Sequence, residues 1–153
     1  MIVYRIAKEE EIKTILGEES LENIGRECKV DYKLNNHNYL PGKKYLHFYP
    51  DYGSIFYTSS QAKRYICTYD IPDDVLERSK GIGYYLDLEF YEHLQEVTEY
   101  AIETDILDFS YLKKIEMMTD LILFEDYCYD EYRDKIETIY EQCSQKVIKK
   151  VKK

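Results

Sequence analysis

The fold of this chain is decided by residues 45–69, whose sequence is YLHFYPDYGSIFYTSSQAKRYICTY. Aromatic and β-branched residues fit the pleated, half-buried surface of a strand. Three runs of them predict three strands, at residues 45–49, 55–58 and 65–71. Pro50 and the turn-forming residues 51–53 separate the first two runs, because proline cannot donate to a sheet and Asp and Gly favour turns.

Polar side chains cluster where these predicted strands end. Ser59 or Ser60 is placed to cap a short helix, since a hydroxyl there accepts a hydrogen bond from a free N–H of the first turn. His47, Tyr57 and Thr58 lie at the ends of the flanking strands. Segments held by a rigid frame often carry chemistry, so this stretch supplies candidate site residues.

The composition is that of a globular protein. Hydrophobic residues make up 44% of the 153 residues and charged residues 33%, which favours a folded chain over a disordered one. A chain of this length predicts one domain, residues 1–153, that buries about two-thirds of the surface its unfolded form exposes. Eighteen Tyr and no Trp predict many half-buried rings whose hydroxyl groups stay hydrogen-bonded.

Charge, cysteine spacing and hydropathy narrow the range of partners. The formal net charge of −9 argues against extended binding of nucleic acid, which needs a basic face. A basic run at residues 146–153 is interpreted as a solvated helix end favoured by the helix dipole. Four widely spaced cysteines and the lack of a signal peptide predict reduced thiols in a cytoplasmic protein. No apolar run approaches the ~18 residues of a membrane span.

No metal site is predicted. His37 lies in a polar stretch without carboxylates or histidines at ligand spacing. The acidic cluster within residues 126–134 lacks the glycine and the alternating ligands of a calcium loop, so it is interpreted as a solvated helix face.

The first residues predict a strand followed by a helix. Residues 1–6 are rich in β-formers, and residues 7–16 combine an apolar helical face with acidic residues in the first turn, where they suit the helix dipole. Arg5 therefore lies near the end of the first strand. An arginine there is either a surface ion-pair partner or, where it faces a cleft, a bidentate ligand of a phosphate.

A later strand is predicted at residues 97–102. Alternation puts Val97, Glu99 and Ala101 on one of its faces. A carboxylate among small apolar residues lies either at an exposed edge or in a cleft where it has a function, and the exposed edge is the favoured interpretation.

The last third of the chain predicts helices. All glycines and prolines precede Tyr84, and apolar residues recur at helical spacing between residues 112 and 147. We therefore expect an α+β fold with a split, mixed β-sheet in residues 1–107 and a helical C-terminal extension in residues 108–153. Gly81 and Gly83 are interpreted as a helix end and a turn, since a dinucleotide fingerprint needs a third glycine.

Several short motifs follow one another in an order that resembles the small bacterial ADP-ribosyltransferase-like proteins. The series comprises Tyr4-Arg5 on a first strand, Asp51-Tyr52-Gly53-x-x-Phe56-Tyr57-Thr58-Ser59 followed by Gln61-Ala62-x-x-Tyr65, and Glu99 on a late strand. In layout the resemblance covers residues 1–107. It implies a split, mixed sheet around a cleft for NAD.

The resemblance also implies roles for single residues. Arg5 would hold a phosphate or ribose of NAD. Tyr57, with Thr58 or Ser59, would stack on or bond to the nicotinamide side. Glu99 would polarise the ribose hydroxyl at the oxocarbenium-like transition state, where a fixed negative charge has its largest effect.

Two positions depart from the pattern of that family. Many of its enzymes carry a second carboxylate two residues before the catalytic Glu, where this chain has Val97. Tyr4-Arg5 is not followed by the small residues that commonly let NAD approach the first strand. His47 offers another ribose or phosphate contact, and the alternative is a strand histidine hydrogen-bonded to a backbone carbonyl.

Two functions remain open on the sequence. The first is transfer of ADP-ribose from NAD to a protein or nucleic-acid acceptor, as by a toxin or a phage-encoded modifier. The second is a non-enzymatic module of the inhibitor or anti-defence type, whose acidic, tyrosine-rich surface occupies a partner's basic site, since tyrosines are enriched in interface hot spots. A third reading is a domain whose cleft is only structural.

Overall fold

The fold is described from a computed structural model of the chain. The structure describes residues 1–17, 26–27, 32–34, 37–39, 42–56, 65–86, 94–122, 128–142 and 147–149. The predicted site residues Tyr57, Thr58 and Ser59 and the predicted helix after them lie outside the described residues.

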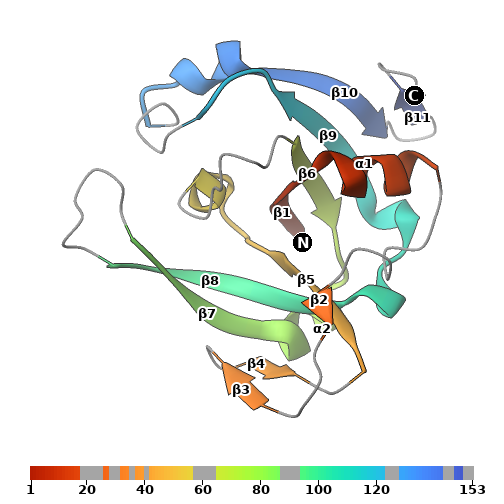
Figure 1. The fold of residues 1–153 in the computed structure, drawn as a ribbon, viewed down its shortest axis with the longest axis vertical. Coiled ribbons are helices and arrows are strands. Elements are labelled where there is room, and N and C mark those ends of the chain that lie inside the picture. Colours follow the sequence, from red (N-terminus) through yellow and green to blue (C-terminus); the bar gives the residue numbers. More distant parts are fainter. Residues whose placement is uncertain are drawn as a thin grey trace.

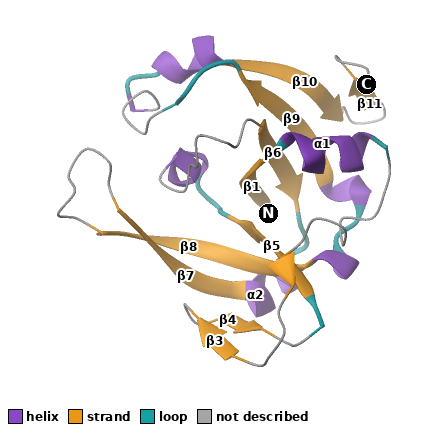
Figure 2. Cartoon of the chain, in the orientation of Figure 1, coloured by secondary structure: helices purple, strands orange, loops and turns teal. Residues whose placement is uncertain are grey.

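The described chain combines strands with short helices (Figure 2). The strands are β1 (Ile2–Ala7), β2 (Arg26–Glu27), β3 (Tyr32–Leu34), β4 (His37–Tyr39), β5 (Lys44–Phe48), β6 (Tyr65–Asp70), β7 (Lys80–Leu86), β8 (Leu94–Glu103), β9 (Leu112–Met118), β10 (Ile136–Gln142) and β11 (Val147–Lys149). The α-helices are α1 (Glu9–Leu16) and α2 (Asp73–Ser79), and the 3-10 helices are η2 (Tyr52–Phe56), η3 (Thr104–Ile106), η4 (Phe109–Tyr111) and η5 (Glu131–Lys135). The predicted α+β class is confirmed.

Two larger sheets organise the described residues (Figure 1). Sheet A has the strand order β1-β6-β9-β10-β11, and sheet B has the order β2-β5-β8-β7, while β3 and β4 form a separate pair. All strand pairings within the described ranges are antiparallel. The sheet is therefore split, as predicted, but the described part of it is antiparallel where a mixed sheet was expected.

Sheets A and B meet where β1 passes the end of β5. The Tyr4 N–H donates to the Tyr49 carbonyl and the Tyr49 N–H donates to the Tyr4 carbonyl, both at 2.8 Å. Pro50 follows directly and has no N–H with which to extend the pairing. We call this two-bond bridge the junction, because on either side of it each strand pairs within its own sheet.

Strands of both sheets contribute their two faces to two different hydrophobic clusters. The main core comprises Val3, Ala7, Ile12, Ile15, Leu46, Phe48, Tyr65, Cys67, Tyr69, Ile71, Val75, Leu76, Tyr100, Ile102, Leu112, Ile115, Ile139 and Tyr140. The second core comprises Ile6, Tyr49, Ile55, Ile66, Val97, Met118 and Ile122, with Tyr4, Tyr52, Tyr132 and Ile136 packed against it. Successive residues along one strand therefore lie on opposite faces of the sheet and contribute to different cores.

The prediction of a helical segment at residues 108–153 is wrong at β9, β10 and β11, although η4 and η5 are short 3-10 helices. β9 pairs with β6 and β10 pairs with β9, so this segment extends sheet A. β9 is buried on both faces, with Ile115 in the main core and Met118 in the second core. A strand covered on both faces lacks the simple alternation of a half-buried one, so its apolar spacing resembles that of a helix.

Two local predictions also need correction. Residues 55 and 56, expected to start a strand, belong to η2, in whose first turn the Gly53 N–H donates to the Asp51 carboxylate at 3.2 Å. Gly81 and Gly83, expected at a helix end and a turn, lie inside β7. α2 ends earlier, at Ser79.

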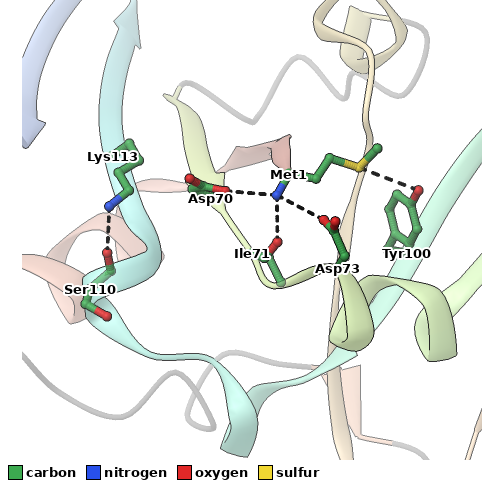
Figure 3. A network of polar contacts seen from close by, with 7 residues as sticks. All are labelled: Met1, Asp70, Ile71, Asp73, Tyr100, Ser110 and Lys113. Carbon is green, nitrogen blue, oxygen red and sulfur yellow. Dashed lines mark hydrogen bonds and ion pairs between the residues drawn. The ribbon is translucent and has the colours of Figure 1, made fainter.

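The chain terminus at Met1 is tied to the end of β6 and the start of α2 (Figure 3). The α-ammonium group donates to the Asp70 carboxylate and to the Ile71 carbonyl, each at 2.9 Å, and to the Asp73 carboxylate at 3.4 Å. The Asp70 hydrogen bond contributes most to a raised pKa of this amine. Both charged contacts are half-exposed or more, so each stabilises only modestly.

Acetylation of the α-amino group in a chain that begins at Met1 is expected to lower the free energy of unfolding by about 0.5 kcal/mol at pH 7. Because the folded pKa lies above the ordinary value of 8.0, the contribution of the charged amine is complete below pH 8 and is lost as the pH rises through the folded pKa. Urea unfolding of the free and acetylated chains between pH 6 and pH 10 measures this difference. A gap that widens with pH would contradict it.

Candidate functional site

Arg5 is buried and bound within the protein. Its Nε donates to Glu11 Oε2 at 2.9 Å and its Nη2 to Glu11 Oε1 at 2.8 Å, which makes a bidentate pair. Its Nη1 donates to the His47 carbonyl at 3.0 Å, and the guanidinium lies 5.7 Å from the centre of the Phe48 ring. The Arg5 and Glu11 side chains are 12% and 6% exposed. Arg5 therefore ties β1 to α1 and β5.

Glu11 is the partner that the sequence did not single out. It was grouped with the acidic first turn of α1, but it is buried while Glu9 and Glu10 are exposed. Burial alone would lower the pKa of the Arg5 guanidinium, but the charge and hydrogen bonds of Glu11 outweigh that effect and raise it. Arg5 on β1 and Glu11 on α1 therefore form a buried ion pair.

Glu99 lies in the middle of β8, inside sheet B. β8 pairs with β7 at Glu99 and with β5 from Tyr100 to Glu103, and because Glu99 is buried the expectation that it sits at an exposed edge is wrong. Glu99 is only 3% exposed. A buried carboxylate is uncommon, since an acidic side chain loses its hydration when it is buried. Its position is therefore a candidate functional site on structural grounds.

His47 and Gly81 flank Glu99 on the two neighbouring strands. His47 pairs with Ala101, two residues from Glu99 on the same face of sheet B, which makes His47 and Glu99 diagonal neighbours. Gly81 pairs directly with Glu99 and brings no side chain. A glycine inside a strand often marks a place where a ligand or another backbone approaches closely.

The side chains of Arg5 and Glu99 lie on opposite sides of the junction: Arg5 is on the side of the main core, and Glu99 is on the side of the second core. Arg5 alternates with Tyr4 and Ile6 and therefore lies on the β1 face of Val3 and Ala7, which belong to the main core. Glu99 shares its β8 face with Val97, which belongs to the second core. The structure thus brings His47 and Glu99 together on one face and keeps the Arg5 side chain on the other.

Tyr4 is the residue of the predicted Tyr4-Arg5 motif that faces the second core. It packs against that core beside Tyr52, with ring centroids 5.1 Å apart and planes at 88°. Sequence reasoning assigned the functional role to Arg5 because a basic residue suits a phosphate. The sequence alone does not show which face of β1 carries Arg5 and which carries Tyr4, because the junction at Tyr4 decides this.

A third buried carboxylate, Glu116 on β9, lies on the same β9 face as Met118 of the second core. Its Oε1 accepts a hydrogen bond from the Tyr52 hydroxyl at 3.1 Å, and its Oε2 lies 3.6 Å from Lys114 Nζ. Burial and the Glu116 charge raise the pKa of Tyr52 far above its usual range. Glu116 was not among the predicted site residues, because its segment was expected to be helical.

The described residues show no metal centre: His, Cys, Asp and Glu side chains nowhere gather there in groups of three or more suited to a metal ion. Within the same ranges, helices are too short or too polar to cross a membrane. Cys67 and Cys128 are free thiols, and burial raises the pKa of the Cys67 thiol well above its ordinary value.

No family model matches this chain, and no curated protein or solved structure is significantly similar to it. The case for a function therefore depends on the arrangement of its residues.

We expect Glu11→Gln to lower the free energy of unfolding by about 3 kcal/mol, because it leaves the buried Arg5 charge without its counter-charge. Glu10→Gln, on the exposed face of the same helix, is the matched control and should change stability by less than about 0.5 kcal/mol. Urea unfolding of both variants at pH 7 measures the difference. Equal stability of the two variants would show that the Arg5–Glu11 pair does not hold the fold together.

Proposed function

We propose that this chain is an ADP-ribosyltransferase-like protein that binds NAD on the Glu99 side of the junction and transfers ADP-ribose to a macromolecular acceptor. The observation that carries this proposal is the burial of Glu99 in the middle of sheet B. Burial removes water from an acidic side chain, and buried carboxylates are found at functional sites as well as in structural ion pairs.

Transfer of ADP-ribose requires mainly a fixed negative charge beside the ribose. The bond between the ribose C1′ and the nicotinamide nitrogen breaks, and nicotinamide leaves with the electron pair. The ribose ring then carries positive charge, and the acceptor's nucleophilic atom bonds to C1′ and gives up a proton. A Glu99 carboxylate that accepts a hydrogen bond from a ribose hydroxyl stabilises this charge, because it is already in place.

Two neighbours of Glu99 support this proposal. Gly81, opposite Glu99 on β7, adds no side chain beside the carboxylate, which suits the close approach of a ribose. His47 on β5 is half-buried on the same face and provides an imidazole for a ribose or phosphate oxygen. The contacts that the resemblance implies between the nicotinamide side and Tyr57, Thr58 and Ser59 remain part of the proposal. These three residues lie outside the described residues.

In this proposal Arg5 supports the fold and does not bind NAD. To reach a phosphate, its guanidinium would have to leave Glu11 and the His47 carbonyl, and Glu11 would remain buried without a counter-charge. This changes the role that the family resemblance implies for Arg5. Tyr4, which packs against the second core, brings no positive charge in place of Arg5, and slow turnover is the expected consequence.

We expect Glu99→Gln to bind NAD with an affinity close to that of the parent and to release nicotinamide about 100-fold more slowly, as is typical when one preorganised electrostatic contact is removed. Glu96→Gln, an exposed position on the same strand, is the matched control and should retain both properties. Calorimetry with NAD and chromatographic detection of nicotinamide measure the two quantities. The proposal fails if the parent binds no NAD at millimolar concentration, or if both variants release nicotinamide at the parent rate.

A second candidate function, protein binding through an acidic surface, is favoured by the segment that precedes β10. Tyr129 is 72% exposed, and Asp130, Glu131 and Asp134 beside it are exposed as well. Tyrosine flanked by carboxylates suits a basic site on a partner protein. These exposed residues come from another segment of the chain than Glu99, so protein binding here is compatible with either function.

Tyr129→Ala combined with Glu131→Lys should abolish salt-sensitive binding to a basic protein partner, because it removes the exposed ring and reverses a charge. Glu9→Lys, which changes an exposed acid on α1, is the control and should leave this binding intact. Pull-down at two salt concentrations gives the comparison. Equal loss of binding in both variants would point to net charge alone.

A further inference from the structure

The Tyr52–Glu116 hydrogen bond connects a short helix to the centre of sheet A. Glu116 is 5% exposed on β9, between β6 and β10. A buried carboxylate needs partners to offset the loss of water, and Tyr52 and Lys114 provide them. Removal of the Tyr52 hydroxyl would therefore leave a charged group short of a hydrogen bond.

Tyr52 also contacts two other elements through its ring. Tyr4 of β1 meets it at right angles, and Tyr132 of η5 lies 5.7 Å away at 50°. Tyr52 therefore joins η2 to β1, β9 and η5. Burial and the Glu116 charge raise the pKa of Tyr52, which favours the protonated hydroxyl that donates to Glu116.

The same helix reaches the face of sheet B that carries Glu99. Ile55, three residues after Tyr52, is fully buried in the second core together with Val97 of β8. Val97 lies two residues before Glu99 on the same face of the strand. Figure 1 shows η2, in gold, between the strands of sheet A and β8.

We propose that the Tyr52–Glu116 pair positions η2 against the Glu99 side of sheet B and so shapes the surface on which NAD binds. Tyr52 and Glu116 act here as positioning residues, since Glu99 carries the chemistry. The part of the proposal that concerns NAD rests on the proposed function, whereas the part that concerns η2 stands by itself.

Tyr52→Phe is the decisive variant, because it keeps the ring contacts with Tyr4 and Tyr132 and removes only the donor. We expect amide hydrogen exchange in η2 (Tyr52–Phe56) to become about tenfold faster in this variant, while exchange in β1 and β6 stays unchanged. Glu116→Gln retains an acceptor oxygen for Tyr52 and should restore most of the protection that Glu116→Leu loses. Tyr129→Phe, at an exposed ring, is the control.

The kinetic readout distinguishes positioning from a merely structural role. In Tyr52→Phe the KM for NAD should rise several-fold while kcat changes little, because the pair shapes the binding surface and leaves Glu99 in place. Unchanged exchange in η2 would overturn the inference, as would exchange that rises equally in all strands. Faster exchange confined to η2 in a protein that binds no NAD would uphold the positioning of η2 and reject the proposed function instead.

Discussion

The buried charge of Arg5 constrains the arrangement of the elements around it. A guanidinium inside the protein must be neutralised and hydrogen-bonded, and Glu11 and the His47 carbonyl meet that need from two different elements. To bring Glu11 to Arg5, α1 must fold back over β1. To bring the His47 carbonyl to Arg5, β5 must pass beside β1, which is where the Tyr4–Tyr49 bridge forms.

The junction also separates two kinds of surroundings. On one side, Arg5 lies among large apolar residues of the main core, with Phe48 and Tyr69 in edge-to-face contact at 5.0 Å. On the other side lie the carboxylates of Glu99 and Glu116, the imidazole of His47 and a group of tyrosines around η2. Polar groups of this kind at the border of a core are typical of a binding site, and this is why the proposed function is assigned to that side.

Much of the fold could be predicted from local sequence. β1, α1, β5, β6 and the centre of β8 follow from β-forming runs, an amphipathic helix and Pro50. β9 and β10 could not be predicted, because β9 is covered on both faces and β10 has a bulge between Thr138 and Tyr140, so neither shows simple alternation. Long-range pairing decides such strands, and no local pattern records it.

The candidate site was predictable in its residue types and not in its geometry. Glu99 was singled out because it stands among small apolar residues, but its burial depends on β7, whose glycines were interpreted as a turn. Arg5 was singled out for its charge, but one position of alternation on β1 puts Tyr4 on the Glu99 side instead. Glu11 and Glu116 look like other surface acids in the sequence, and only their tertiary partners distinguish them.

We propose that Arg5 holds the fold together on one side of the junction while NAD binds on the other. The Nε–H signal of Arg5 in the two-dimensional ¹H–¹⁵N NMR spectrum, followed during a titration with NAD, tests it most directly. We expect this signal to stay in place while the amide signals of Tyr49, Glu99 and Gly81 shift with a common saturation curve. A shift of the Arg5 Nε–H signal on that same curve, with Glu99 and Gly81 unaffected, would contradict it.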